Sequence, residues 1–99
     1  MQQQERRVKQ RFPIQLTIVI RSAPSEIHGV SRDVSGIGVF FYTDNWPLGF
    51  SPIEFRMILP ALLTGTESIP VVCQGTVTRL EGLKGKIGVV ATIDSYAFS

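Results

Sequence analysis

The stretch PIQLTIVIR, residues 13–21, decides how this chain should fold. Its side chains alternate, so that Ile14, Leu16, Ile18 and Ile20 share one face of an extended segment. A hydrophobic period of two, rather than 3.6, is typical of a β-strand with one buried face. Most of the remaining chain shows the same period, interrupted by turn signals about every ten residues. The sequence therefore predicts an all-β protein.

Five further strands are predicted, at residues 27–34, 37–43, 51–59, 69–80 and 84–93. The segments DNWPLG (44–49) and PALLTGTES (60–68) are typical of loops. Six antiparallel strands in so short a chain usually close into a barrel, because open sheet edges invite aggregation. We expect a six-stranded antiparallel β-barrel over residues 12–99, with at most a short C-terminal helix in the final residues, IDSYAFS.

Length and composition limit the possible functions. The 99 residues, 43% of them hydrophobic, suffice for one small core. No stretch approaches the roughly 20 apolar residues of a membrane span, and the N-terminus lacks a secretion signal. We therefore expect one cytoplasmic domain without membrane insertion. Cys73 and His28 are the only cysteine and histidine. No metal-ligand spacing, catalytic triad or paired carboxylates are apparent, so we expect no metal, no cofactor and no enzyme activity.

Basic residues concentrate at the N-terminus. Residues 1–11 contain Arg6, Arg7, Lys9 and Arg11 against one acidic residue, for a net charge of +3, whereas the rest of the chain carries −1. A nucleic-acid-binding protein usually spreads its cations over a whole face, so this placement favours a small anionic ligand. Because residues 1–11 also lack a periodic apolar face, they are predicted to form a flexible basic arm.

A second polar stretch, SRDVSGIG, covers residues 31–38. Strand alternation places Ser31, Asp33 and Ser35 on one face, predicted to point away from the barrel interior. Gly38 lets the backbone turn or lets a ligand approach closely. Taken alone, the stretch favours a hairpin turn stabilised by its own serine or aspartate side chain over a ligand site.

Together, the two stretches resemble the PilZ domain family. That family has R-x-x-x-R before the first barrel strand, found here as Arg7 and Arg11, and D-x-S-x-x-G about twenty residues later, found here as Asp33, Ser35 and Gly38. The resemblance implies a six-stranded barrel that binds the bacterial second messenger cyclic di-GMP through these five residues.

The resemblance also indicates two more arginines as candidate ligand-binding residues. Arg6 precedes the first motif, a position where an arginine in this family tends to accompany two bound ligand molecules. Arg79 ends the fifth predicted strand, where related domains often carry a ligand-contacting group, although a solvated strand end is as plausible. The same two interpretations stay open for Arg32. A loop tryptophan, Trp46, is expected to cover one end of the barrel rather than to stack on a base.

The chemistry of these residue types fits such a ligand. Arginine can donate two bonds to a phosphate or to O6 and N7 of guanine, and its plane can stack on a base. We expect a non-enzymatic sensor in which the arm becomes ordered on the ligand and presents a new surface to a downstream protein. Two alternatives are a PilZ-like protein-interaction module that does not bind cyclic di-GMP, and a small barrel that binds single-stranded nucleic acid. No DNA or RNA partner is expected, because no strand face interleaves aromatic and basic residues.

Overall fold

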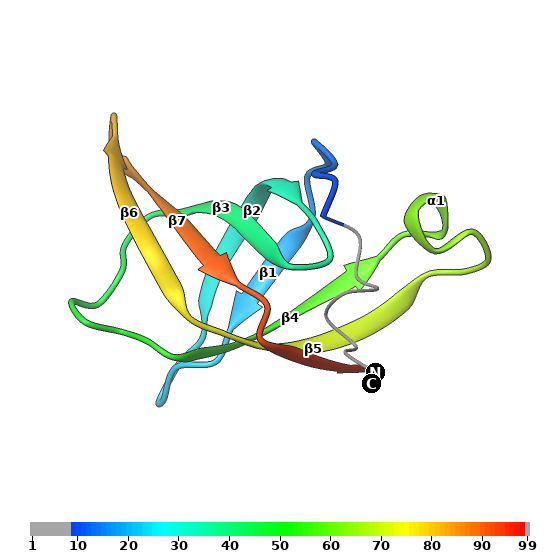
Figure 1. The fold of residues 1–99 in the computed structure, drawn as a ribbon. Coiled ribbons are helices and arrows are strands. Elements are labelled where there is room, and N and C mark those ends of the chain that lie inside the picture. Colours follow the sequence, from blue (N-terminus) through cyan, green and yellow to red (C-terminus); the bar gives the residue numbers. More distant parts are fainter. Residues whose placement is uncertain (1–8, 99) are drawn as a thin grey trace.

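The computed structural model describes residues 9–98 (Figure 1). Its elements are β1 (Thr17–Ile20), β2 (Ile27–Val34), β3 (Gly38–Thr43), β4 (Ile53–Leu59), α1 (Ala61–Thr64), β5 (Ile69–Gly75), β6 (Val77–Leu83), β7 (Lys86–Thr92) and β8 (Ser95–Phe98). The strands form one antiparallel sheet in the order β6-β7-β3-β2-β1-β4-β5-β8. The all-β prediction is confirmed. The single helical turn, α1, lies within the predicted 60–68 loop.

The last four strands form one long hairpin. Gln74 of β5 lies opposite Ser95 of β8, and Leu83 of β6 lies opposite Lys86 of β7, with one register irregularity between Val77 and Arg79. The fifth predicted strand is divided into β5 and β6. The sixth corresponds to β7, and β8 continues the hairpin beyond the predicted end at residue 93. One half of the hairpin pairs with β4 and the other half with β3. This arrangement joins the two ends of the sheet and closes the barrel, as six strands were predicted to do.

A glycine allows the hairpin to bend. A Cβ atom at Gly75 would collide with the carbonyl oxygen of Thr92. The two halves of the hairpin therefore approach too closely there for any larger residue. Beyond this bend the end of the chain differs from expectation. The residues expected to form at most a short helix are strand β8, because they continue the hairpin register and pair their backbone with Val71–Gln74.

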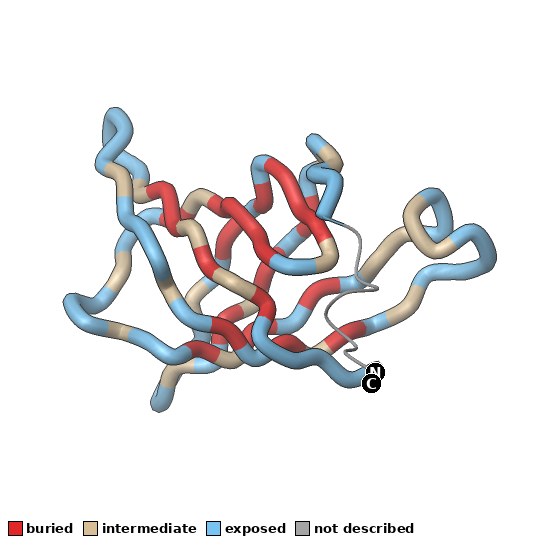
Figure 2. Tube along the Cα trace, viewed as in Figure 1, coloured by how far each residue is buried: buried red, intermediate tan, exposed pale blue. Residues whose placement is uncertain are grey.

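The core lies inside the barrel, where Figure 2 shows buried residues along the strands. The alternation predicted for the first strand is confirmed, since Leu16, Ile18 and Ile20 are buried. Trp46 packs edge-on against Phe41, with ring centroids 5.7 Å apart, and is partly buried against the core cluster. Among residues 9–98, no helix has the length and apolar character needed to cross a membrane.

Candidate ligand-binding site

A β-bulge in β2 shapes the site. Ser31 lies opposite Phe41 and Asp33 lies opposite Phe40, so the register shifts by one residue at Arg32. Such an insertion places two residues against one on the partner strand and re-aims the side chains around it. Ser31 therefore shares the inner face with the fully buried Phe41, whereas Asp33 shares the outer face with Phe40.

The bulge corrects the sequence prediction for Ser31. This side chain was expected on the outer face beside Asp33, but it is 1% exposed and points inward. Its hydroxyl accepts a hydrogen bond from the backbone N–H of Leu16, 2.8 Å, and donates one to the carbonyl of Ile14, 2.6 Å. Ser31 thus fixes the segment before β1 to β2, which is a structural role.

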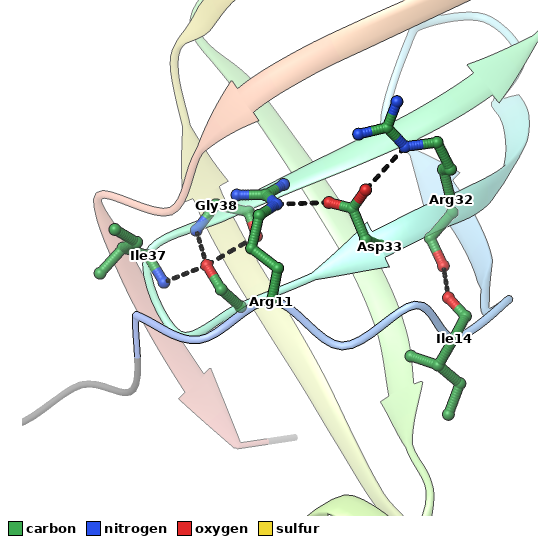
Figure 3. A network of polar contacts seen from close by, with 8 residues as sticks. Arg11, Ile14, Arg32, Asp33, Ile37 and Gly38 are labelled. Atoms are coloured by element: carbon green, nitrogen blue, oxygen red, sulfur yellow. Dashed lines mark hydrogen bonds and ion pairs between the residues drawn. The ribbon is translucent and has the colours of Figure 1, made fainter.

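Asp33 is held by two arginines (Figure 3). Nε of Arg11 donates to Oδ1 at 2.5 Å, and Nε of Arg32 donates to Oδ2 at 2.7 Å. Burial alone would raise the pKa of Asp33, but the bonds from Arg32 and Arg11 outweigh it and hold the pKa below its ordinary value. The same bond to Asp33 raises the pKa of Arg32. The carboxylate is therefore a charged anchor for two guanidinium groups.

The backbone next to Arg11 is paired with β2. Phe12 and Val34 exchange two backbone hydrogen bonds, of 2.7 and 3.0 Å, as an isolated antiparallel bridge. In this antiparallel bridge Arg11 lies opposite Ser35, and from there its side chain reaches Asp33. Because each arginine uses its Nε atom for the carboxylate, the terminal amino groups of both guanidinium groups are not engaged in these two bonds.

Ser35 and Gly38 lie beside this network, at the β2–β3 turn. The Ser35 hydroxyl accepts hydrogen bonds from the backbone N–H groups of Ile37 and Gly38, both at 3.2 Å. It is the stabilising side chain of the turn that the sequence also allowed. A Cβ atom at Gly38 would lie 3.0 Å from the carbonyl oxygen of Ala91 and 3.8 Å from a terminal nitrogen of Arg11. A side chain at Gly38 would therefore lie between the β7 backbone and the guanidinium group of Arg11.

Arg79 lies on the same outer face, farther along it. Asp33 lies opposite Phe40, Phe40 opposite Val90, and Val90 opposite Arg79. This row crosses three strand spacings, about 14 Å. Arg79 is 60% exposed and pairs with Glu81 at 2.9 Å. It therefore forms the far end of a surface row that begins with the Asp33 network.

The structure brings together Arg11, Asp33, Ser35 and Gly38, and it places Arg79 on the same face. Arg6 and Arg7 lie outside the described residues. Within residues 9–98, no three histidine, cysteine, aspartate or glutamate side chains gather as metal ligands would.

The sequence analysis left Arg32 undecided and did not select Phe40. The Arg32 guanidinium lies 3.9 Å from the centre of the Phe40 ring, and that ring is 2% exposed although it belongs to the outer face. The only available signal was the apolar character of both faces of residues 37–43, which requires a cover on the outer side. Arg32 supplies part of that cover.

Known proteins share this fold. The family model described as "PilZ domain" matches residues 5–96. The solved structure of the Bacillus subtilis inhibitor of motility, MotI/DgrA, is similar with a TM-score of 0.68 and 18% identity. That similarity covers 98% of this chain but only 45% of the MotI/DgrA chain. The PilZ domain of CeSA from a cellulose-synthesizing bacterium is similar with a TM-score of 0.50 and 21% identity, over 88% of this chain and 84% of that one. No curated protein sequence matches the chain.

Proposed function

Because the chain belongs to the PilZ domain family, we propose that it binds cyclic di-GMP on the outer face of the barrel. PilZ domains are a family of cyclic di-GMP receptors that act as binding and adaptor domains rather than as catalysts. The proposed ligand-binding residues are Arg6, Arg7, Arg11, Asp33, Ser35, Gly38 and Arg79.

One observation carries the proposal, namely the bond between Arg11 and Asp33 above Gly38. The carboxylate orients the guanidinium group through Nε and leaves its terminal amino groups for a ligand. Arginine in a fixed orientation can donate two parallel bonds to a phosphate or to the O6 and N7 edge of guanine. Gly38 adds clearance, since no side chain occupies the space below Arg11.

The N-terminal residues complete the proposed site. We propose that residues 1–11 act as a basic arm, flexible before the point where Asp33 holds Arg11, and that residues 12–99 form the barrel domain. Arg7 supplies a second cation from the arm, and Arg6 a third. Two stacked ligand molecules would bring four phosphate charges together, and an additional planar cation offsets their repulsion. We therefore propose two ligands per chain, with Arg6→Leu shifting the count toward one.

Ligand binding would be coupled to signalling through the arm. An arm that becomes ordered over the ligand presents a surface that the unbound protein lacks. That surface would recruit a downstream protein in the bacterial cytoplasm. Backbone order parameters across residues 5–11, with and without cyclic di-GMP, test this step. An arm that is equally rigid in both states would contradict it.

Calorimetric titration tests the ligand itself, with cyclic di-GMP, cyclic di-AMP, GTP and a short oligonucleotide as separate probes. We expect binding to cyclic di-GMP and little to cyclic di-AMP, because adenine lacks the O6 acceptor of guanine. Equal affinity for the two cyclic dinucleotides would contradict guanine recognition. No binding to any probe would favour a PilZ-like protein-interaction module, and preference for the oligonucleotide would favour a nucleic-acid-binding barrel.

A further inference from the structure

The bulge in β2 gives Arg32 an unusual position. Arg32 and Asp33 are consecutive, yet both contact groups on the outer face, because the bulge sets the two residues against the single Phe40 of β3. In a regular strand the two side chains would point to opposite faces. The bulge therefore adds a second guanidinium group beside the Asp33 carboxylate.

The contacts of Arg32 hold its guanidinium plane in place. Nε donates to Asp33 at 2.7 Å, and the guanidinium carbon lies 3.9 Å from the centre of the Phe40 ring. Phe40 fits closely against β7, since a Cβ atom at Gly88 would lie 2.9 Å from the ring. A rigid aromatic ring thus supports one side of the guanidinium group, while the Arg32 side chain remains 52% exposed.

The surroundings of Arg32 leave room for a planar group. Arg32 lines a cleft of about 820 Å³, whose other lining residues include Val30, Tyr42, Asp44 and Lys86. This volume is within the range of about 300–1,000 Å³ that is usual for small-molecule sites. A guanidinium group stacked on one aromatic ring can accept a second π-system on its opposite side.

We propose that Arg32 is an additional ligand-binding residue, whose guanidinium group stacks between Phe40 and a guanine base of the bound cyclic dinucleotide. This inference rests on the proposed function. Arg32 acts in two ways, since its Nε fixes the Asp33 carboxylate and its free side receives the base. It extends the site from the Asp33 network toward the cleft beside Tyr42.

Titration of Arg32→Lys with cyclic di-GMP tests the stacking. Lysine keeps the positive charge but has no plane, so affinity is expected to fall about tenfold. Arg56→Lys is the matched control. Arg56 is also a half-exposed arginine paired with a carboxylate, that of Glu26, but it belongs to β4 and not to the Asp33 network. Affinity of the control should change less than about twofold.

A second measurement separates stacking from mere support of Asp33. In the unmodified protein, proton NMR should show the Arg32 Hε signal moving upfield on addition of cyclic di-GMP, because a base ring then lies over the guanidinium group. An unchanged affinity in Arg32→Lys would overturn the inference, and so would a loss of affinity without the upfield shift. If the unmodified protein does not bind cyclic di-GMP at all, the proposed function fails. If Arg11→Ala loses binding and Arg32→Lys does not, only this inference fails.

Discussion

The two faces of the β2–β3 hairpin use neighbouring residues for opposite purposes. On the inner face, Ser31 and Phe41 are almost completely buried, and the serine hydroxyl bonds only to backbone groups. On the outer face, Asp33 and Phe40 are also shielded from solvent, but the groups that shield them include half-exposed arginines. Burial alone therefore does not distinguish core residues from site residues in this hairpin. Core and site differ in whether the side chain that covers the buried residue can give up its present contacts and bind a ligand instead.

The strongest test of this difference is Phe41→Ala. Phe41 is fully buried, so the variant should lose about 3–5 kcal/mol of unfolding free energy through lost packing and the cavity that remains. Urea denaturation measures the change. Leu80→Ala is the control, because Leu80 belongs to the same cross-strand row but is 46% exposed. It should change stability by about 0.5 kcal/mol or less. Equal losses of unfolding free energy in Phe41→Ala and Leu80→Ala would mean that the buried and the exposed residues of this row do not differ in packing.

Arg11→Ala probes the outer face. The variant should bind cyclic di-GMP roughly ten- to a hundredfold more weakly, because hydrogen bonds to charged groups contribute about 1.5–3 kcal/mol. Its stability without ligand should change by less than about 1 kcal/mol, since the Arg11 side chain is 42% exposed. Arg7→Ala should have a similar effect on binding. Calorimetry and thermal unfolding give the two quantities.

Arg21→Ala is the control for Arg11→Ala. Arg21 is 80% exposed and pairs with Glu54 at 3.5 Å, so the Arg21→Ala variant also loses an arginine–carboxylate pair. It should bind normally. If Arg11→Ala binds as tightly as this control, the residues before Phe12 have no part in ligand recognition.

Ser31→Ala should have the reverse effect of Arg11→Ala. Removing the hydroxyl leaves the buried N–H of Leu16 without its partner, at an expected cost of about 1–3 kcal/mol in unfolding free energy. The affinity of the folded variant for cyclic di-GMP should stay unchanged. Asp33→Ala is the matched outer-face variant and should mainly weaken binding. A Ser31→Ala protein that is fully stable but binds poorly would invert the assignment of the two faces.

The smallest expected effect is the pH dependence contributed by Asp33. Its pKa in the folded protein is lowered, so its stabilising contribution is fully present above the unfolded value of about 3.9. That contribution is lost as the pH falls through the lower folded pKa. NMR titration of the Asp33 carboxyl carbon should therefore give a midpoint below the reference pKa of about 3.9 for an unperturbed aspartate. Arg32→Gln should raise the midpoint, whereas a midpoint above the reference in the unmodified protein would contradict the paired carboxylate.

Much of the fold could be predicted because its signals are local. The alternation of Leu16, Ile18 and Ile20 follows from adjacent residues, as do the loops around β4. The division of the fifth predicted strand into β5 and β6 could not be predicted from adjacent residues. Gly75 is required there because of a carbonyl group on β7, at Thr92, which the local sequence does not reveal. Strand β8 likewise depends on pairing with β5, whose paired residues lie 21 to 27 positions earlier, from Gln74↔Ser95 to Val71↔Phe98.

The site was predictable to the extent that it follows short motifs. The spacing of Asp33, Ser35 and Gly38 located the β2–β3 turn correctly, and Arg11 does contact Asp33. The face of Ser31 was predicted wrongly, because alternation assumes a regular strand and the bulge changes the parity by one residue. The contact between Arg32 and Phe40 was missed for the same reason. The ligand-binding roles of all these residues remain predictions.

The long hairpin that closes the barrel has a consequence for folding order. Its two strands meet through the tight turn at Gly85 and can zip together from contacts that are close in sequence. Its docking on β3 and β4, in contrast, joins segments far apart along the chain and must overcome a larger loop-closure entropy. We expect the hairpin to form early and barrel closure to limit the folding rate. Gly85→Val, at a position whose φ of 81° suits glycine, should therefore slow folding, because a turn that forms before the rate-limiting step contributes to the stability of the transition state.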